Sequence, residues 1–198
     1  MSTVLDSQGS KAVRNGAEFE KISGLNFNKL HPKYRVRMMY EKDKGYYIFQ
    51  GKDIICESHP KKQFKAYFHT NTISYQMDMP NMEPDNCIIN WKTKTIYIIE
   101  IKFQHKEGSV DEKPQAYIFR QRYFNDLLKS MGMKVKLIYV FNDWFRQNKY
   151  NYLRRNMDID GVDYYYNELP PSAIGLDENP FGVVVVHNNV QTDELTLW

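Results

Sequence analysis

The sequence is poor in cysteine, in excess charge and in long apolar runs. Its 198 residues contain two cysteines, Cys56 and Cys87, and neither stands in a Cys/His spacing typical of zinc, so a disulfide scaffold and a zinc module are excluded. No apolar window approaches the length that spans a bilayer, and residues 1–10 have no apolar core typical of a signal peptide. We therefore expect a cytoplasmic protein, without membrane contact, whose thiols stay reduced.

The charges nearly cancel. There are 27 Lys and Arg residues against 24 Asp and Glu, a net charge of +3. The net charge therefore does not indicate a nucleic-acid partner, and only local clusters of basic residues could indicate one. Hydrophobic residues make up 42% of the chain, which is enough for a packed core. Repeats and low-complexity linkers are absent from the sequence, which favours one domain over residues 1–198.

One hairpin organises the chain. Two apolar runs, Cys87–Trp91 and Thr95–Phe103, flank a short polar turn, as in two paired strands. Side chains alternate between the faces of a strand, so Glu100 and Lys102 share one face. Asp85 precedes the first strand, and a hairpin brings the start of its first strand beside the end of its second. The sequence therefore predicts that these three charged residues meet at one edge of a sheet.

Two carboxylates beside a lysine suit the metal-assisted hydrolysis of a phosphodiester. Mg²⁺ prefers oxygen ligands and keeps several waters, and the carbonyl oxygen of Ile101 is a third candidate ligand. The metal offsets charge on the pentavalent phosphate and lowers the pKa of water, while the lysine orients the attacking water. The alternative is that Glu100 and Lys102 form an exposed ion pair on an edge strand, which contributes little to stability.

Pro84-Asp85 followed by Glu100-Ile101-Lys102 resembles the PD-(D/E)xK nuclease superfamily, which includes many type II restriction endonucleases. The similar region is short, about residues 83–115. The resemblance implies a restriction-endonuclease-like fold, Mg²⁺ as cofactor with Mn²⁺ as a substitute, and double-stranded DNA as substrate. It also implies products with a 5′-phosphate and a 3′-hydroxyl. A homodimer is expected if the target is a palindrome, because two-fold protein symmetry mirrors two-fold DNA symmetry.

Further acidic and polar residues are candidates for the same site. Glu112 and Gln115 stand at the start of the next predicted helix, and Glu18 and Glu20 stand on a helix predicted over Lys11–Ser23. The resemblance implies that an acid on the first helix, or a glutamine on the later one, joins the site. Helix capping and solvation explain the same residues, so both interpretations stay open.

The remaining pattern predicts a single α/β domain with a mixed central β-sheet flanked by helices. Further strands are predicted over Tyr34–Glu41, Tyr46–Glu57 with an interruption at residues 51–53, Lys134–Phe141, Val162–Asn167 and Phe181–His187. Helices are predicted over Pro114–Met131, where Ile118 and Phe119 join the apolar spacing, and over Asp143–Asn156. Residues 66–79 are interpreted as a strand or a loop. The strand–helix–strand order predicts that Lys134–Phe141 runs parallel to Thr95–Phe103.

Three groups of basic residues are candidates for contacts to the DNA backbone. They are Lys61, Lys62 and Lys65 around an aromatic residue, Arg120 on the helix after the hairpin, and Arg146 and Arg154 in the most basic segment. Lysine and arginine neutralise phosphates without reading the base sequence. The alternative for the lysines and for Arg120 is a solvated surface charge. The alternative for the most basic segment is an amphipathic helix whose aromatic residues join the core, and that is compatible with DNA contact.

The sequence thus predicts a Mg²⁺-dependent endodeoxyribonuclease that cuts double-stranded DNA at a specific sequence. One alternative within the nucleases is a junction-resolving or repair enzyme, which recognises DNA shape. A second alternative is a non-catalytic DNA-binding module whose acidic residues are structural.

Overall fold

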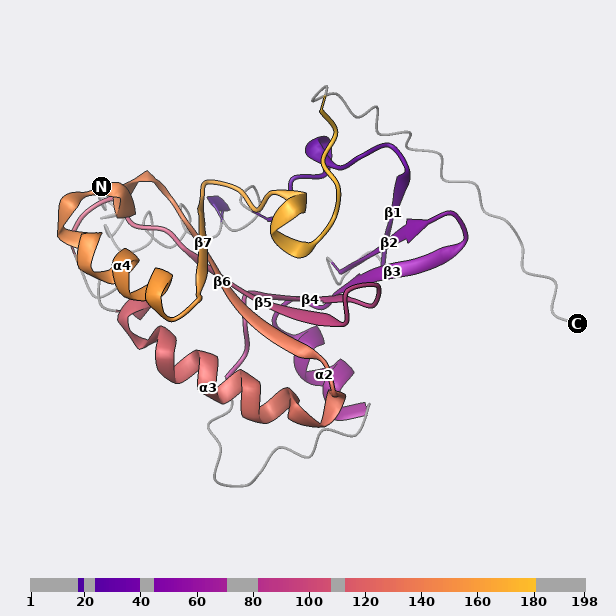
Figure 1. The fold of residues 1–198 in the computed structure, drawn as a ribbon, viewed down its shortest axis with the longest axis horizontal. Coiled ribbons are helices and arrows are strands. Elements are labelled where there is room, and N and C mark those ends of the chain that lie inside the picture. Colours follow the sequence, from indigo (N-terminus) through magenta and orange to yellow (C-terminus); the bar gives the residue numbers. More distant parts are fainter. Residues whose placement is uncertain (1–17, 20–23, 40–44, 71–81, 108–112, 181–198) are drawn as a thin grey trace, which may run out of the picture.

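The computed structural model describes residues 18–19, 24–39, 45–70, 82–107 and 113–180. In this part of the chain, one seven-stranded sheet carries its strands in sequence order (Figure 1). The strands are β1 (Tyr34–Met38), β2 (Tyr46–Gln50), β3 (Asp53–Ser58), β4 (Asn86–Asn90), β5 (Thr95–Lys102), β6 (Lys134–Phe141) and β7 (Asp163–Tyr166). Strands β1 to β5 are antiparallel, and β5, β6 and β7 are parallel. The predicted mixed α/β fold and the parallel pairing of β5 with β6 are confirmed.

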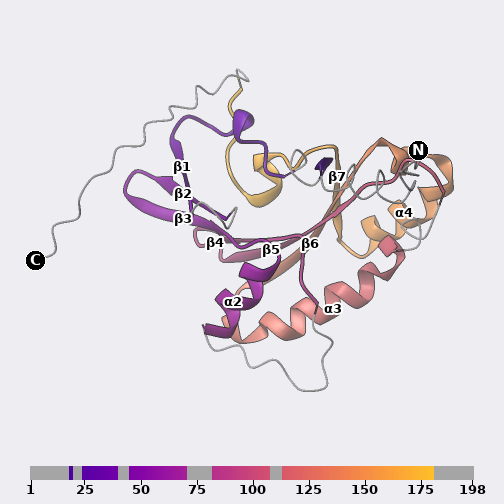
Figure 2. The ribbon, with the colours of Figure 1, turned by 180° about the vertical axis from the view of Figure 1, so that it is seen from behind.

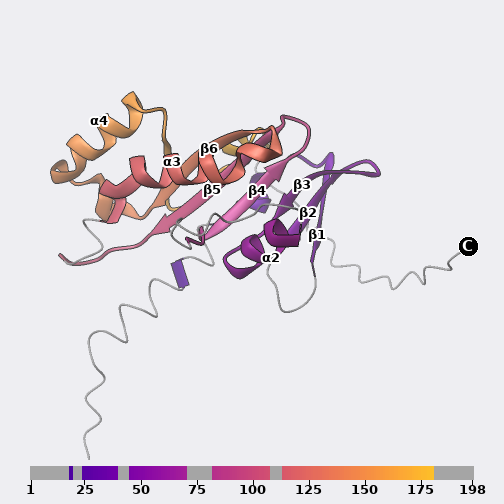
Figure 3. The same ribbon diagram turned by 90° about the horizontal axis from the view of Figure 1, so that it is seen from below.

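Three α-helices pack on one face of this sheet (Figures 1 and 3). They are α2 (Lys62–Thr70), α3 (Tyr117–Leu128) and α4 (Asn151–Ile159), with short 3₁₀ turns beside them. Both parallel connections, β5 to β6 and β6 to β7, run through these helices. The buried side chains of α2, α3 and α4 meet Ile96 and Ile98 of β5 in one cluster. The face of β5 that carries Glu100 is therefore the face under the helices.

The opposite face is covered by two irregular segments from distant parts of the chain, which lie side by side in Figures 1 and 2. A bridge joins Leu25 to Leu169, and a second joins Leu30 to Glu178. The buried Asn90 fastens this layer to the sheet, because its Nδ2 donates to the carbonyl of Ile174 at 2.8 Å. With both faces covered, β5 is buried along almost its whole length.

One prediction about secondary structure is wrong. Residues 66–70 are neither strand nor loop, because they complete α2. Phe64 and Phe68 are both fully buried there, and their spacing of four places them on one face of a helix. The predicted helix 11–23 falls mostly outside the described residues, and the predicted strand 181–187 falls wholly outside them. Within the described part, no helix is long and apolar enough to cross a membrane.

The buried face of α3 also differs from the expected one. Ile118 and Phe119 are 39% and 56% exposed, although they share the apolar spacing. The buried stripe of α3, at 100° per residue, is formed by Tyr123, Phe124, Leu127 and Leu128. Positions 118 and 119 both lie far from the centre of this stripe. Position 120 falls near the middle of that stripe, so the helix directs Arg120 toward the sheet.

This geometry gives a paired test of stability. Phe124→Ala is expected to lower the free energy of unfolding by about 3–5 kcal/mol, since it leaves a cavity in a fully buried position. Phe119→Ala on the same helix is the matched control, and its change is expected to stay within about 0.5 kcal/mol. Urea unfolding followed by circular dichroism measures both. Similar losses for the two variants would contradict the assignment of the buried face.

Candidate active site

The hairpin β4–β5 brings the predicted charged residues together. Asn86, the first residue of β4, pairs with Ile99 of β5, so Asp85 lies opposite the end of β5. The carboxylate oxygen Oδ2 of Asp85 accepts a hydrogen bond from the backbone N–H of Ile101 at 2.7 Å. This bond fixes the orientation of the aspartate relative to the strand that carries the other two charged residues.

Lys102 sits among three oxygen atoms. Its Nζ donates to Glu100 Oε2 at 2.7 Å, to Asp85 Oδ2 at 3.0 Å and to the carbonyl of Ile101 at 3.2 Å. These are the oxygens of the three residues that the sequence suggests as metal ligands. In this arrangement the lysine ammonium is the cation at their common centre.

Arg120 is the residue of this cluster that the sequence did not assign to it. The Nη1 of Arg120 donates to Glu100 Oε1 at 2.7 Å, and the two side chains are 25% and 2% exposed. Both carboxylate oxygens of the buried Glu100 are therefore bound, one by lysine and one by arginine. The helical position of Arg120, four residues before Phe124, was a usable signal, because it places the guanidinium on the buried side of α3.

The charges of the cluster are balanced. Two carboxylates, Asp85 and Glu100, face two cations, Lys102 and Arg120. Burial raises the pKa of Glu100, and Lys102 and Arg120 oppose that rise. Burial lowers the pKa of Lys102, but the carboxylates of Glu100 and Asp85 outweigh it, so this pKa is raised overall. The lysine is therefore held as a charged ammonium. The alternative of an exposed ion pair on an edge strand is wrong, because β5 is central and Glu100 is buried.

The backbone after β5 is tied to the end of β6. The Nδ2 of Asn142 donates to the carbonyl of Gln104 at 2.7 Å, and its Oδ1 accepts from the N–H of Gln104 at 3.2 Å. The N–H of Asn142 also donates to the carbonyl of Lys102 at 3.3 Å. These bonds hold the strand end that carries the Glu-x-Lys pair, so the site is built on rigid backbone.

The donor atoms fit a hard divalent cation. Asp85, Glu100 and the carbonyl of Ile101 offer only oxygen, which is the ligand type of Mg²⁺ and Mn²⁺. Among the residues that the structure describes, no group of three or more His, Cys, Asp or Glu side chains could hold a metal ion. Two carboxylates and one carbonyl leave room for the waters that Mg²⁺ retains, and they do not form the closed cage of a structural metal.

In the described part of the chain, no hydrogen bond or ion pair joins Glu18 or Gln115 to this cluster. Glu18 is exposed. Gln115 is also exposed and lines a pocket between α3 and α4 with Tyr117 and Asn156; in the described part of the chain no hydrogen bond joins it to the carboxylates. Glu20 and Glu112 lie outside the described residues.

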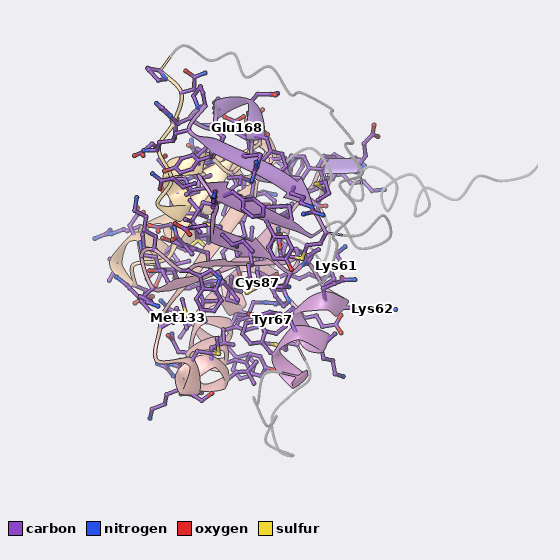
Figure 4. All side chains as sticks on the ribbon, turned by 90° about the vertical axis from the view of Figure 1, so that its right-hand side faces the viewer. Lys61, Lys62, Tyr67, Cys87, Met133 and Glu168 are labelled. Carbon is purple, nitrogen blue, oxygen red and sulfur yellow. The ribbon has the colours of Figure 1, made fainter. Side chains whose placement is uncertain are left out.

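The basic residues predicted to contact DNA differ in how far they are exposed and in the contacts they make within the protein. Lys61 and Lys62 are exposed at the start of α2 (Figure 4), and Lys65 is half-buried one turn later. Arg146 and Arg154 have partners within their own segment. The Nε of Arg146 donates to Asp143 at 2.8 Å, and the guanidinium lies over the ring of Tyr166. Arg154 donates to the carbonyls of residues 145–147, so it holds the turn before α4.

Comparisons with known proteins leave the family open. A scan against protein-family models finds no match, and a search of curated proteins finds none either. Among solved structures, the chain is similar to MunI restriction endonuclease in complex with cognate DNA, with 14% sequence identity and a TM-score of 0.37. That likeness covers 61% of this chain and 76% of that chain. A likeness of this degree carries no argument about function, which has to rest on the geometry of Asp85, Glu100 and Lys102.

Proposed function

We propose that this protein is a Mg²⁺-dependent endonuclease that hydrolyses phosphodiester bonds in double-stranded DNA. The observation that carries the proposal is the convergence of Asp85 Oδ2, Glu100 Oε2 and the Ile101 carbonyl around one cation position, held by Lys102. The motif Pro-Asp…Glu-x-Lys supports it, because the structure joins its separate parts in space. The proposal covers residues 1–198 as one nuclease domain that acts in the cytoplasm.

The chain's own residues have distinct roles in this reaction. Asp85, Glu100 and the carbonyl of Ile101 would hold the metal, which would supply Lewis-acid stabilisation of the phosphate charge. Lys102 donates a hydrogen bond that orients the attacking water toward phosphorus. Cleavage of the bond to the 3′ oxygen leaves a 5′-phosphate and a 3′-hydroxyl. Mn²⁺ substitutes for Mg²⁺, since both prefer oxygen ligands.

The proposed substrate is a specific sequence in double-stranded DNA, as for a type II restriction endonuclease. In this proposal Lys61, Lys62 and Lys65, at the start of α2, neutralise backbone phosphates. A homodimer follows if the target is a palindrome, because each subunit then cuts one strand. A junction-resolving or repair nuclease would use the same site on branched DNA.

The wild-type protein is expected to cut a long unmethylated DNA into discrete fragments with Mg²⁺ or Mn²⁺, and to leave it intact with EDTA. Gel electrophoresis measures the fragments, and their joining by a DNA ligase, which requires a 5′-phosphate and a 3′-hydroxyl, identifies the end groups. Cleavage confined to a four-way junction would replace restriction by the junction-resolving alternative. Binding of linear and branched DNA with no metal-dependent cleavage of either would support a non-catalytic module and refute the nuclease.

A further inference from the structure

Arg120 is placed to act on more than one anion. It projects from the buried stripe of α3 to Glu100, and yet a quarter of its side chain remains exposed. Its partner oxygen, Glu100 Oε1, is not the oxygen that Lys102 binds. Part of the Arg120 side chain is therefore accessible to an incoming group.

The charge balance of the cluster changes when a divalent cation enters. In the structure, two carboxylates and two side-chain cations cancel. A divalent cation adds two positive charges beside Lys102 and Arg120, and like charges at this separation repel strongly at low effective dielectric. A phosphodiester removes one of these charges, and the doubly charged pentavalent phosphate of the transition state removes both. The positive charge of the divalent cation, Lys102 and Arg120 together is therefore balanced when the transition state is present. It is in excess when only Asp85 and Glu100 are present.

We propose that Arg120 is a catalytic residue that leaves Glu100 and binds a non-bridging oxygen of the substrate phosphate when the metal takes Glu100. The inference rests on the proposed function and adds a fourth residue to it. No bond to carbon or phosphorus is made or broken by Arg120, which exchanges one oxygen anion for another. In the resting protein the same contact closes the site, because Arg120 and Lys102 together satisfy Glu100.

The chemistry of arginine suits this exchange. A guanidinium is planar, stays charged and presents a fork of N–H donors that fits carboxylate and phosphate oxygens alike. Its weak hydration also lowers the cost of moving it between two partly buried anions.

The exchange predicts opposite effects of one substitution on two measurements. In the DNA-free protein, Arg120→Gln is expected to bind Mn²⁺ about tenfold more tightly than the wild type, since one positive charge beside the metal position is gone. At saturating Mn²⁺, its single-turnover DNA cleavage is expected to fall about 100-fold, as after loss of one transition-state donor. Electron paramagnetic resonance of free Mn²⁺ measures the first quantity, and quenched-flow electrophoresis the second.

Two further variants make the result specific. Arg122→Gln is the matched control, because two residues along α3 turn the side chain about 200° away from Arg120, and both quantities are expected to stay at wild-type values. Arg120→Lys keeps the charge without the fork, so Mn²⁺ affinity is expected near the wild-type value, with cleavage between those of wild type and Arg120→Gln. Thermal melting checks that each variant is folded.

Each other outcome has a defined meaning. Weaker Mn²⁺ binding together with slower cleavage in Arg120→Gln would show a structural role and overturn the inference, and so would two unchanged values. Unchanged Mn²⁺ affinity with altered preference among DNA sequences would make Arg120 a base-contacting residue and overturn it as well. A wild type that neither binds Mn²⁺ nor cuts DNA would overturn the proposed function, and the inference with it.

Discussion

Glu100→Ala is expected to abolish DNA cleavage, a loss of about 1,000-fold or more, since a bound metal contributes several kcal/mol to the stabilisation of the transition state. Glu100 provides one of the three oxygens at the cation position and is the most deeply buried acid of the cluster. Glu100→Gln keeps the shape of the side chain and removes its charge, and the same loss is expected. Cleavage rates at fixed Mg²⁺, with circular dichroism to confirm folding, measure the effect.

A glutamate outside the cluster, Glu57, provides the control for the Glu100 variants. Glu57 accepts a hydrogen bond from Trp91 Nε1 at 3.0 Å and lies 3.2 Å from His59 Nε2, outside the contacts of the active-site cluster. Glu57→Gln is therefore expected to change stability and to leave cleavage at the wild-type rate. If Glu100→Ala cut DNA as fast as the wild type, the assignment of this edge of the sheet would be wrong.

Lys102→Met is expected to separate metal binding from catalysis. The ammonium of Lys102 occupies the centre of the three oxygens, so its removal leaves Asp85 and Glu100 with excess negative charge. We expect Mn²⁺ affinity in the absence of DNA to rise by about tenfold, while cleavage falls by about 10²–10⁴-fold, the range for loss of one proton-handling or water-orienting group. Mn²⁺ titration and single-turnover cleavage measure the two quantities.

A lysine on the neighbouring parallel strand is the comparison. Lys136 pairs with Asp163 at 3.2 Å at the surface, where an ion pair contributes at most about 1 kcal/mol. Lys136→Met is expected to leave metal binding and cleavage unchanged. Wild-type cleavage by Lys102→Met would refute the role of the lysine in catalysis. Weaker Mn²⁺ binding by this variant would refute the occupation of the metal position by the lysine.

Local sequence pattern was sufficient for the hairpin and its charged residues. Alternation along Thr95–Lys102 places Glu100 and Lys102 on one face, and the polar turn after Asn90 fixes the register that brings Asp85 to them. The parallel pairing of β6 followed from the length of the strand–helix–strand unit, because short crossovers leave few topologies. These features depend on neighbours in the chain, which a single sequence records.

Contacts between segments far apart in the chain could not be predicted from local sequence pattern and became visible only in the tertiary structure. The angle of Arg120 on α3 follows from helical spacing, but the strand it meets depends on how α3 docks across β5 and β6. The coverage of the second sheet face by segments around Leu25 and Leu169 has no local pattern, and that coverage is what buries β5 on both sides. The sequence by itself therefore determined that Asp85, Glu100 and Lys102 meet at one edge of the hairpin. Tertiary packing determined that Glu100 is buried and held by two cations, since burial and ion pairing depend on residues far apart in the chain.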